Sequence, residues 1–358
     1  MTLRTRAALA ALVATMTAAA CTGGGDDAAE LTTTTDGTAD TTTTSEVMVD
    51  DTTTTSAAPA PAGPGMPLTG LPIDESIADR PALVIKIDNH PRARPQTGLD
   101  LADLVFEVRA EGVTRFMGVF HSQTPDPVGP VRSSRTSDFD LLRGLDNPLY
   151  ASSGGNDYVA NGLRNLPIQQ ATALSLTDQY FRDGSRPAPH NLYSNASSLW
   201  ELAAEDSTAP GAWFTYRDEG DELSSSATEI TGAVTVSYRG SPVVTHTWDA
   251  AVGGWLRTQD GRPHTTIGGD QLAPENVVIM VADYRVSAAD PASPEVVSVG
   301  TGQLYVLTDG HAITGTWSRE TAEGKPELVD DSGNEIALTR GRTWILMPEP
   351  GDVTLPAS

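Results

Sequence analysis

The chain has 358 residues, of which 47 are acidic and 23 are basic, so its formal net charge is −24. A surface this acidic argues against a nucleic-acid partner, because binding to phosphates depends on basic side chains. The sequence contains one cysteine, Cys21, which excludes an intramolecular disulfide, a multi-cysteine zinc site and an iron–sulfur cluster.

The first 20 residues have the pattern of a bacterial lipoprotein signal peptide. Arg4 and Arg6 precede an uncharged run, residues 7–20, that is too short to span a bilayer. Small residues lead into Cys21 as in the bacterial lipobox, with Ala18 at the place of the usual leucine. We therefore predict that residues 1–20 are removed and that Cys21 carries lipid, including palmitate, at the outer face of the cytoplasmic membrane. The alternative is ordinary signal cleavage that leaves a chance cysteine.

Residues 21–66 are predicted to form a disordered tether. From Thr22 to Met66 there are eight acidic residues, no basic residue and three runs of four threonines. Such a segment buries too little apolar surface to offset its ordering entropy. As a coil of about 5–6 Å × √n, its 45 residues would span roughly 35–40 Å. That length would hold a folded domain away from the membrane and within the cell envelope.

The segment 67–220 mixes strand and helix patterns. Apolar runs predict strands at Ala82–Asp88, Leu104–Ala110 and Thr114–His121. Helical periodicity predicts short helices at Asp138–Leu145, Asp157–Leu166 and Leu199–Ala204, with capping boxes beginning at Ser137 and Ser198. We expect an N-terminal mixed α/β domain.

The segment 228–350 has the pattern of strands joined by tight turns. Apolar and β-branched runs predict strands at 235–238, 243–248, 255–258, 276–284, 303–308, 311–317 and 341–347. Asp309-Gly310 between two of them is typical of a two-residue hairpin turn. We expect a mostly antiparallel β C-terminal domain, joined to the first by a polar linker near residues 218–226. The predicted fold class is therefore α+β.

Several uncommon polar strings occur in order along the chain, and they resemble one known family. The strings are Asp88-Asn89-His90-Pro91, Arg94-Pro95-Gln96, Ala102-Asp103, Gly129-Pro130-Val131-Arg132-Ser133, Pro189-His190-Asn191-Leu192-Tyr193, Gly315-Thr316-Trp317 and Gly341-Arg342-Thr343-Trp344. Over about residues 67–350 the chain resembles the YerB-like bacterial lipoproteins, a domain of unknown function with N- and C-terminal halves. The resemblance implies a tethered envelope protein and implies no particular reaction.

Arg132 and Arg135 directly precede the helix predicted from Ser137. Free backbone N–H groups and the helix dipole favour an anion there, and two guanidiniums could grip a carboxylate or phosphate in bidentate fashion. Asp138 and Asp140 in the first turn offer the alternative of an internal Arg–Asp network.

His90 and His190 each lie in a proline-bounded polar loop. With Asp88 and His121 they could form a metal site or an acid–base pair if the fold brings them together. The alternative is that both imidazoles hydrogen-bond to the backbone and hold their loops. Glu107 and Glu111 could imitate a glycosidase carboxylate pair, and strand tryptophans could line a groove or form core.

The common catalytic signatures are absent from the sequence. Lipidation would occupy Cys21, no serine stands three residues before either lysine, and there is no G-x-S-x-G, H-E-x-x-H or P-loop string. We predict no cofactor and no metal. The prediction is a membrane-anchored lipoprotein that binds a cell-wall polymer or an envelope protein through a polar cleft formed by Arg132, Arg135, His190, Asn191, Asp88, His90, Arg94 and Asp103.

Two alternatives to this prediction stay open. One is a cell-wall-acting hydrolase or transferase that uses Asp or Glu with His as acid and base. The other is a scaffold whose partner contacts an exposed apolar patch.

Overall fold

The computed structural model describes residues 65–239 and 242–356. The predicted signal peptide, Cys21 and nearly all of the predicted tether lie outside these residues. Within them, no helix combines the length and the apolar character that crossing a membrane requires.

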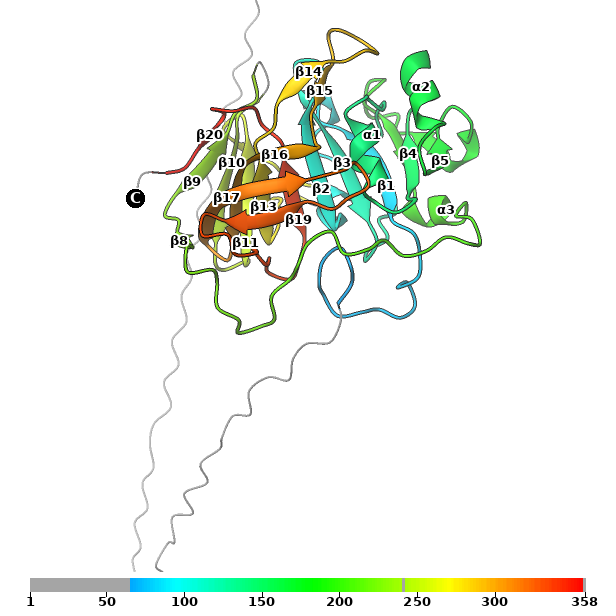
Figure 1. Cartoon of the computed structure of the whole chain (residues 1–358). Helices are drawn as coiled ribbons and strands as arrows, with labels where there is room; N and C mark the ends of the chain where they lie inside the picture. The colour runs from blue at the N-terminus through cyan, green and yellow to red at the C-terminus, as the bar shows by residue number, and fades with distance from the viewer. Residues whose placement is uncertain (1–64, 240–241, 357–358) are drawn as a thin grey trace, which may run out of the picture. The chain divides into compact units, whose positions relative to one another are not determined.

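One large sheet of 11 strands organises the molecule (Figure 1). Its order is β18-β17-β16-β13-β19-β2-β3-β1-β4-β5, and β8 also pairs with β17. The strands are β1 (Leu83–Asp88), β2 (Leu104–Arg109), β3 (Thr114–Phe120), β4 (Leu149–Ser152), β5 (Gln169–Thr172), β8 (Thr228–Glu229), β13 (Asn276–Met280), β16 (Gly300–Thr308), β17 (His311–Arg319), β18 (Glu327–Asp330) and β19 (Thr343–Leu346).

Strands from both predicted segments belong to this sheet. β19, near the end of the chain, lies between β13 and β2 and is parallel to both. Through β19 the strands of residues 276–330 continue directly into those of residues 83–172.

The central strands are covered on both faces, which explains their nearly continuous apolar sequences. Every residue of β1 and of β3 is buried. Alternate side chains enter different cores: Val84 lies in one cluster, whereas Leu83 and Ile85 lie in the other. Lys86, buried in β1, is a charged exception within these strands.

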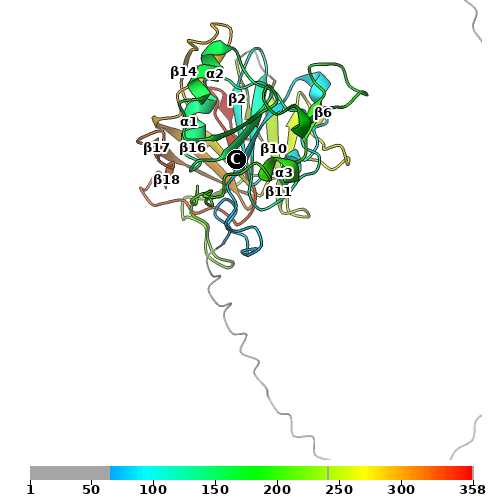
Figure 2. The same ribbon diagram turned by 90° about the vertical axis from the view of Figure 1, so that its right-hand side faces the viewer.

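Helices cover one face and a second sheet covers the other. The first core contains α1 (Asp138–Arg143) and α2 (Asp157–Leu163). The opposite core contains α3 (Ala196–Trp200) and a five-stranded sheet, β12-β11-β10-β9-β20. Figure 2 shows α1 and α2 on one side of β2, and β10, β11 and α3 on the other. The five strands are β9 (Ala233–Val236), β10 (Val244–Asp249), β11 (Gly254–Gln259), β12 (Arg262–Pro263) and β20 (Val353–Thr354).

Short elements complete the described chain. They are the 3-10 turns η1 (Pro91–Ala93), η2 (Leu99–Leu101) and η3 (Thr177–Gln179), and the paired strands β6 (Tyr180–Arg182) with β7 (Leu192–Ser194) and β14 (Tyr284–Val286) with β15 (Pro294–Val296). The molecule is mostly sheet with a few short helices, in agreement with the predicted α+β class.

The predicted helix starts need two corrections. The third helix is Ala196–Trp200, and Asn195 precedes it, so Ser198 lies inside the helix and cannot cap it. Ser137 has helical φ and ψ of −54° and −24° and makes no capping bond. Its hydroxyl instead accepts a hydrogen bond from the backbone N–H of Val296, 3.1 Å away. The tryptophans Trp255, Trp317 and Trp344 are core residues, 0–3% exposed.

Candidate functional site

A short extended segment, residues 128–132, joins the end of β1 to β7. Backbone hydrogen bonds hold it on both sides: Arg132 N donates to Lys86 O (2.8 Å), and Val131 N donates to Leu192 O (2.6 Å). Because β7 directly follows His190, this arrangement brings His190 and Arg132 to Asp88, the last residue of β1.

The buried carboxylate of Asp88 is the centre of the site. Its side chain is 2% exposed. Oδ1 accepts the backbone N–H of His90 at 2.9 Å. Oδ2 lies 2.7 Å from Nδ1 of His190 and 3.4 Å from Nε of Arg132. One carboxylate oxygen therefore positions an imidazole and a guanidinium side by side.

The two histidines of the site stack on each other. Their ring centroids are 4.2 Å apart with an interplanar angle of 13°. Nδ1 of His90 accepts the backbone N–H of Arg92 (3.1 Å). Burial, followed by the neighbouring His190, lowers the pKa of His90. The contact of His190 Nδ1 with Asp88 places a proton on Nδ1, and Nε2 has no hydrogen-bond partner among the described residues.

Three arginines and two carboxylates carry the charge of the site, and of these Arg115 and Asp88 are buried. We name Arg115, Arg132 and Arg135 the arginine cluster. Glu111 binds Arg115 Nη2 at 2.8 Å and also pairs with Arg135. Although burial raises the pKa of Glu111, the hydrogen bond from Arg135 and the charge of Arg115 lower it to about 2. Burial, followed by the charge of Arg135, lowers the pKa of Arg115 to about 10.

A cavity of about 330 Å³ adjoins the arginine cluster. Arg135 and the hydroxyl groups of Ser133 and Ser153 line it, and these hydroxyl oxygens are 3.1 Å apart. The string Ser153-Gly154-Gly155-Asn156 borders this cavity. Gly154 has a φ of +100°, and a Cβ there would lie 2.4 Å from Leu174. Backbone geometry therefore requires this glycine without any ligand.

Comparisons with known proteins place these residues in a family. Residues 68–209 match the model described as "Protein of unknown function (DUF3048) N-terminal domain", and residues 234–345 match the DUF3048 C-terminal domain. The chain belongs to the DUF3048 family. The resemblance inferred from the polar strings is thereby confirmed.

One curated and one solved relative share most of the chain. The protein named "Putative lipoprotein YerB" from Bacillus subtilis (strain 168) is 29% identical over 292 residues, covering 78% of this chain and 84% of YerB. The crystal structure of YerB from Bacillus subtilis matches with a TM-score of 0.70 at 25% identity, covering 82% of this chain and 99% of that chain. Asp88, His90, Arg132, Arg135 and His190 all lie within the DUF3048 N-terminal domain.

We expected an anion-binding site at the start of α1. In the structure the carboxylate of Asp138 already occupies it. Asp138 Oδ2 accepts the backbone N–H of Arg135 at 2.8 Å, and its other oxygen binds Lys86 Nζ at 2.5 Å. Both side chains of this ion pair are fully buried. The predicted internal network is thus present between Asp138 and the backbone N–H of Arg135, whereas the side chains of Arg132 and Arg135 pair with Asp88 and Glu111 instead of Asp138 and Asp140.

The other predicted residues have different surroundings. Asn191 holds the loop before β7, because its Oδ1 accepts from Arg182 (2.8 Å) and its Nδ2 donates to two backbone carbonyls, at 3.1 Å and 3.2 Å. Arg94 lies on the other side of the loop after β1, 3.8 Å from Asp260. Asp103 is 1% exposed and accepts the backbone N–H of Ser122 at 2.8 Å.

Two hypotheses about further groups are corrected. Glu107 is fully buried and paired with Arg257, so it forms no open carboxylate pair with Glu111. His121 is buried, and neither ring nitrogen has a hydrogen-bond partner within the described part of the chain. Residues 65–239 and 242–356 contain no cluster of three His, Cys, Asp or Glu side chains that could hold a metal ion.

Sequence reasoning missed Arg115, which contributes to the arginine cluster, and the role of Glu111 in pairing with it. A usable signal was present, because Arg115 is a charged residue in an otherwise apolar run. Such a residue must find a partner when its strand is buried.

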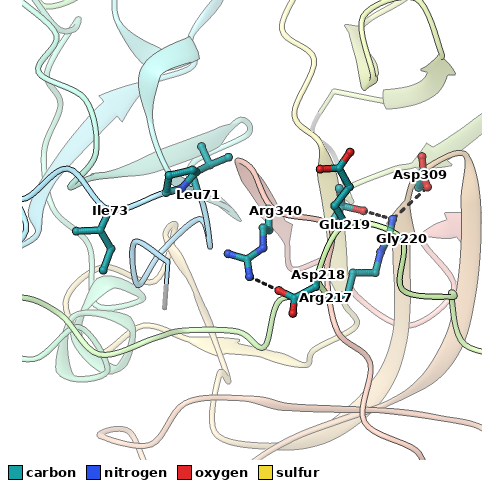
Figure 3. Close-up of a pocket in the computed structure, with 10 residues that line it drawn as sticks. Leu71, Ile73, Arg217, Asp218, Glu219, Gly220, Asp309 and Arg340 are labelled. Carbon is teal, nitrogen blue, oxygen red and sulfur yellow. Dashed lines mark hydrogen bonds and ion pairs between the residues drawn. The ribbon is translucent and has the colours of Figure 1, made fainter. Parts of the chain in front are cut away.

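A larger cavity, of about 770 Å³, lies near the first described residues. Its arginines already have partners, since Arg340 pairs with Asp218 and Arg217 lies 3.1 Å from Asp309 (Figure 3). Leu71 also lines this cavity and is 40% exposed. The cavity offers an apolar wall beside neutralised charges, unlike the arginine cluster.

Proposed function

We propose that this protein is an extracytoplasmic lipoprotein, anchored through lipid on Cys21, whose arginine cluster binds an anionic group of a cell-wall polymer or an envelope protein. The sequence before Cys21 supports the anchor, and so does the name of the relative YerB, which calls that protein a lipoprotein. The tether of residues 21–66 would give the binding domain reach from the membrane.

The single observation that carries the binding proposal is the way Asp88 presents Arg132. Arg132 faces Asp88 with its Nε atom, and its two terminal nitrogens have no acceptor among the described residues. Its side chain is 24% exposed, whereas that of Asp88 is 2% exposed. A buried carboxylate thus lies 3.4 Å from Nε of an accessible guanidinium and leaves its terminal nitrogens for another acceptor, which suits bidentate recognition of a carboxylate or phosphate.

Local charge also supports an anionic ligand. The arginine cluster contributes three positive charges, against one each from Asp88 and Glu111. This local excess is unusual in a chain with a net charge of −24. His190 lies next to Arg132, because both contact the same oxygen of Asp88. An anion at Arg132 would therefore also be within reach of the imidazole.

The binding proposal is tested by co-sedimentation of the detergent-solubilised full chain with purified cell walls. One sample of walls is intact, and a second is stripped of its phosphate polymers so that carboxylates remain. Arg132→Ala and His190→Ala should each weaken binding roughly 10- to 100-fold, since a hydrogen bond to a charged group contributes about 1.5–3 kcal/mol. Binding lost on stripping identifies phosphate, and binding retained identifies carboxylate.

Arg143→Ala is the matched control for this experiment. Arg143 is a surface arginine whose partner is Glu323, 3.2 Å away, and it touches no residue of the site. If the Arg132 and His190 variants bind walls as well as the Arg143 variant does, the proposed binding site is wrong. Circular dichroism of all three variants shows that the comparison is made between folded proteins.

A second candidate function is acid–base chemistry on cell-wall material. The observation in its favour is the Asp88–His190 pair, where the carboxylate orients Nδ1 and leaves Nε2 to exchange a proton. In this case the wild-type protein would release soluble fragments from walls, and His190→Gln would abolish release while Arg132→Ala weakened binding. An absence of release by the wild-type protein at several pH values would contradict this second function.

A further inference from the structure

A second polar cavity lies between the loop after β1 and the β11–β12 hairpin. It has a volume of about 290 Å³, and its lining includes Pro91 and Arg94 from the loop and Gln259, Arg262 and His264 from the hairpin. The two basic side chains meet no acidic residue in the lining. Outside the lining, Asp260 lies 3.8 Å from Arg94, and its side chain is 51% exposed.

Buried hydrogen-bond donors in this lining lack acceptors. Nε of Arg94 and Nε2 of Gln259 are both buried without a partner among the described residues. Gln259 is 1% exposed as a whole residue. A buried donor without an acceptor costs about 1–3 kcal/mol, so such groups call for an explanation, and a ligand that supplies the acceptor is one. The orphaned acceptor nearby, Oδ1 of Asn89, does not belong to the lining.

The orientation of the Gln259 amide is determined by its neighbours. Oε1 accepts from Arg257 Nη1 at 3.0 Å and from Asn89 Nδ2 at 3.2 Å. Since a guanidinium can only donate, the atom that faces Arg257 must be the oxygen. The unpartnered atom of Gln259 is therefore the NH₂ group, a donor.

His264 cannot supply the missing acceptor. Its Nδ1 faces Arg257 and must accept, so Nε2 carries the proton and donates to Oε1 of Gln96 at 2.8 Å. Burial, followed by the charge of Arg257, lowers the pKa of His264 well below its usual range. Both ring nitrogens of His264 therefore have partners already, and the ring supplies no acceptor to Arg94 or Gln259.

We propose that this cavity is a second binding subsite, separate from the arginine cluster, for an anionic oxygen group: a carboxylate or a phosphate. The negative charge faces Arg94 and Arg262, and an oxygen accepts from the Gln259 amide. The subsite stands on different residues from the proposed function, and either could exist without the other.

The chain offers an isosteric variant that tests this subsite. Gln259→Glu keeps an oxygen in place for Arg257 and Asn89, but it replaces the free donor with a negatively charged oxygen. Arg94→Met removes the guanidinium and keeps the aliphatic stem. Both are made in the Arg132→Ala background, in which binding at the arginine cluster is weakened.

Inorganic phosphate is the probe, titrated by calorimetry into the full-length detergent-solubilised protein at low ionic strength, with acetate as the competing carboxylate. The Arg132→Ala parent should still bind phosphate, and Gln259→Glu and Arg94→Met should each weaken that binding at least tenfold. Displacement of phosphate by acetate assigns carboxylates to the subsite, and no displacement assigns phosphate.

The proposal is overturned if the parent binds no phosphate, or if both variants bind it as the parent does. Failure of the proposed function is a different result: in that case the wild type and the Arg132→Ala parent bind phosphate equally. An additional Arg143→Ala variant in the same background, which should change nothing, controls for the loss of a surface charge.

Discussion

The ion pair between Glu107 and Arg257 joins the two sheets, and we predict that it contributes strongly to stability. Glu107 extends from β2 of the large sheet and Arg257 from β11 of the smaller one, and both side chains are fully buried. Arg257 Nη2 donates to the two carboxylate oxygens at 2.9 Å and 3.0 Å. Thr114 donates to the same carboxylate at 2.7 Å, and the guanidinium lies 4.8 Å from the ring of Trp344.

The expected loss of stability arises because each single substitution removes one partner of the ion pair and leaves the other partner buried. Glu107→Gln leaves a buried guanidinium with neutral partners, among them Gln259 and His264, and without its counter-charge. Arg257→Met leaves a buried carboxylate whose remaining side-chain partner among the described residues is Thr114. Each should lower the free energy of unfolding by about 3–5 kcal/mol, which is typical for breaking a buried pair. The double variant should cost less than the sum of the two, because no lone charge is left behind.

Urea unfolding followed by circular dichroism measures these four proteins as a double-mutant cycle. The matched control is Glu323→Gln, which breaks a surface pair with Arg143 in which the two side chains are 61% and 32% exposed. That variant should cost no more than about 1 kcal/mol. The reasoning would be refuted if either single variant lost no more free energy of unfolding than the control. It would also be refuted if the losses of the two single variants simply added in the double variant.

Three further predictions concern the anchor, the pH dependence and the site. Cys21→Ser should abolish membrane retention, as fractionation would reveal, and normal retention would contradict the lipid anchor. Because the pKa of Glu111 is lowered from 4.5 to about 2, its stabilisation is present above pH 4.5 and is lost as the pH falls toward 2. In urea titrations Glu111→Gln should remove about 1–2 kcal/mol of the stability change between pH 5 and pH 2, allowing for solvent screening; an unchanged pH profile would contradict the pairing. Asp88→Asn should weaken wall binding about tenfold. Its control, Asp103→Asn, changes an equally buried carboxylate and should lower the melting temperature without changing the affinity for walls. Equal effects of the two substitutions on affinity would argue against Asp88 as the positioning residue.

Local patterns in the sequence predicted most of the strands but not their arrangement. The run Leu83–Asp88 is recognisable because four of its six residues are apolar. The pairing of β19 with β2 joins Thr343 to Leu104 and depends on contacts between segments far apart in the chain. No local pattern reports such a contact, so the sharing of one sheet by both segments was not predictable from the sequence.

The candidate site was predictable in its residue types and only partly in its geometry. Asp88, His90 and His190 were grouped by their proline-bounded strings, and the structure places them together. The link is the backbone of residues 128–132, which lies between β1 and β7. Arg94 and Asp103 belong to equally polar strings, but the chain turns their side chains elsewhere, and composition alone does not distinguish the two outcomes.

The position of β19 has a consequence for biogenesis. Ribosomes synthesise a chain from its N-terminus, so residues 343–346 emerge after all the other strands of the large sheet. Until then β2 and β13 each lack a neighbour on the side that β19 occupies, and two strand edges stay open to proteases and to wrong pairing. A chain that stops before residue 343 would lack this strand, and both edges would stay open.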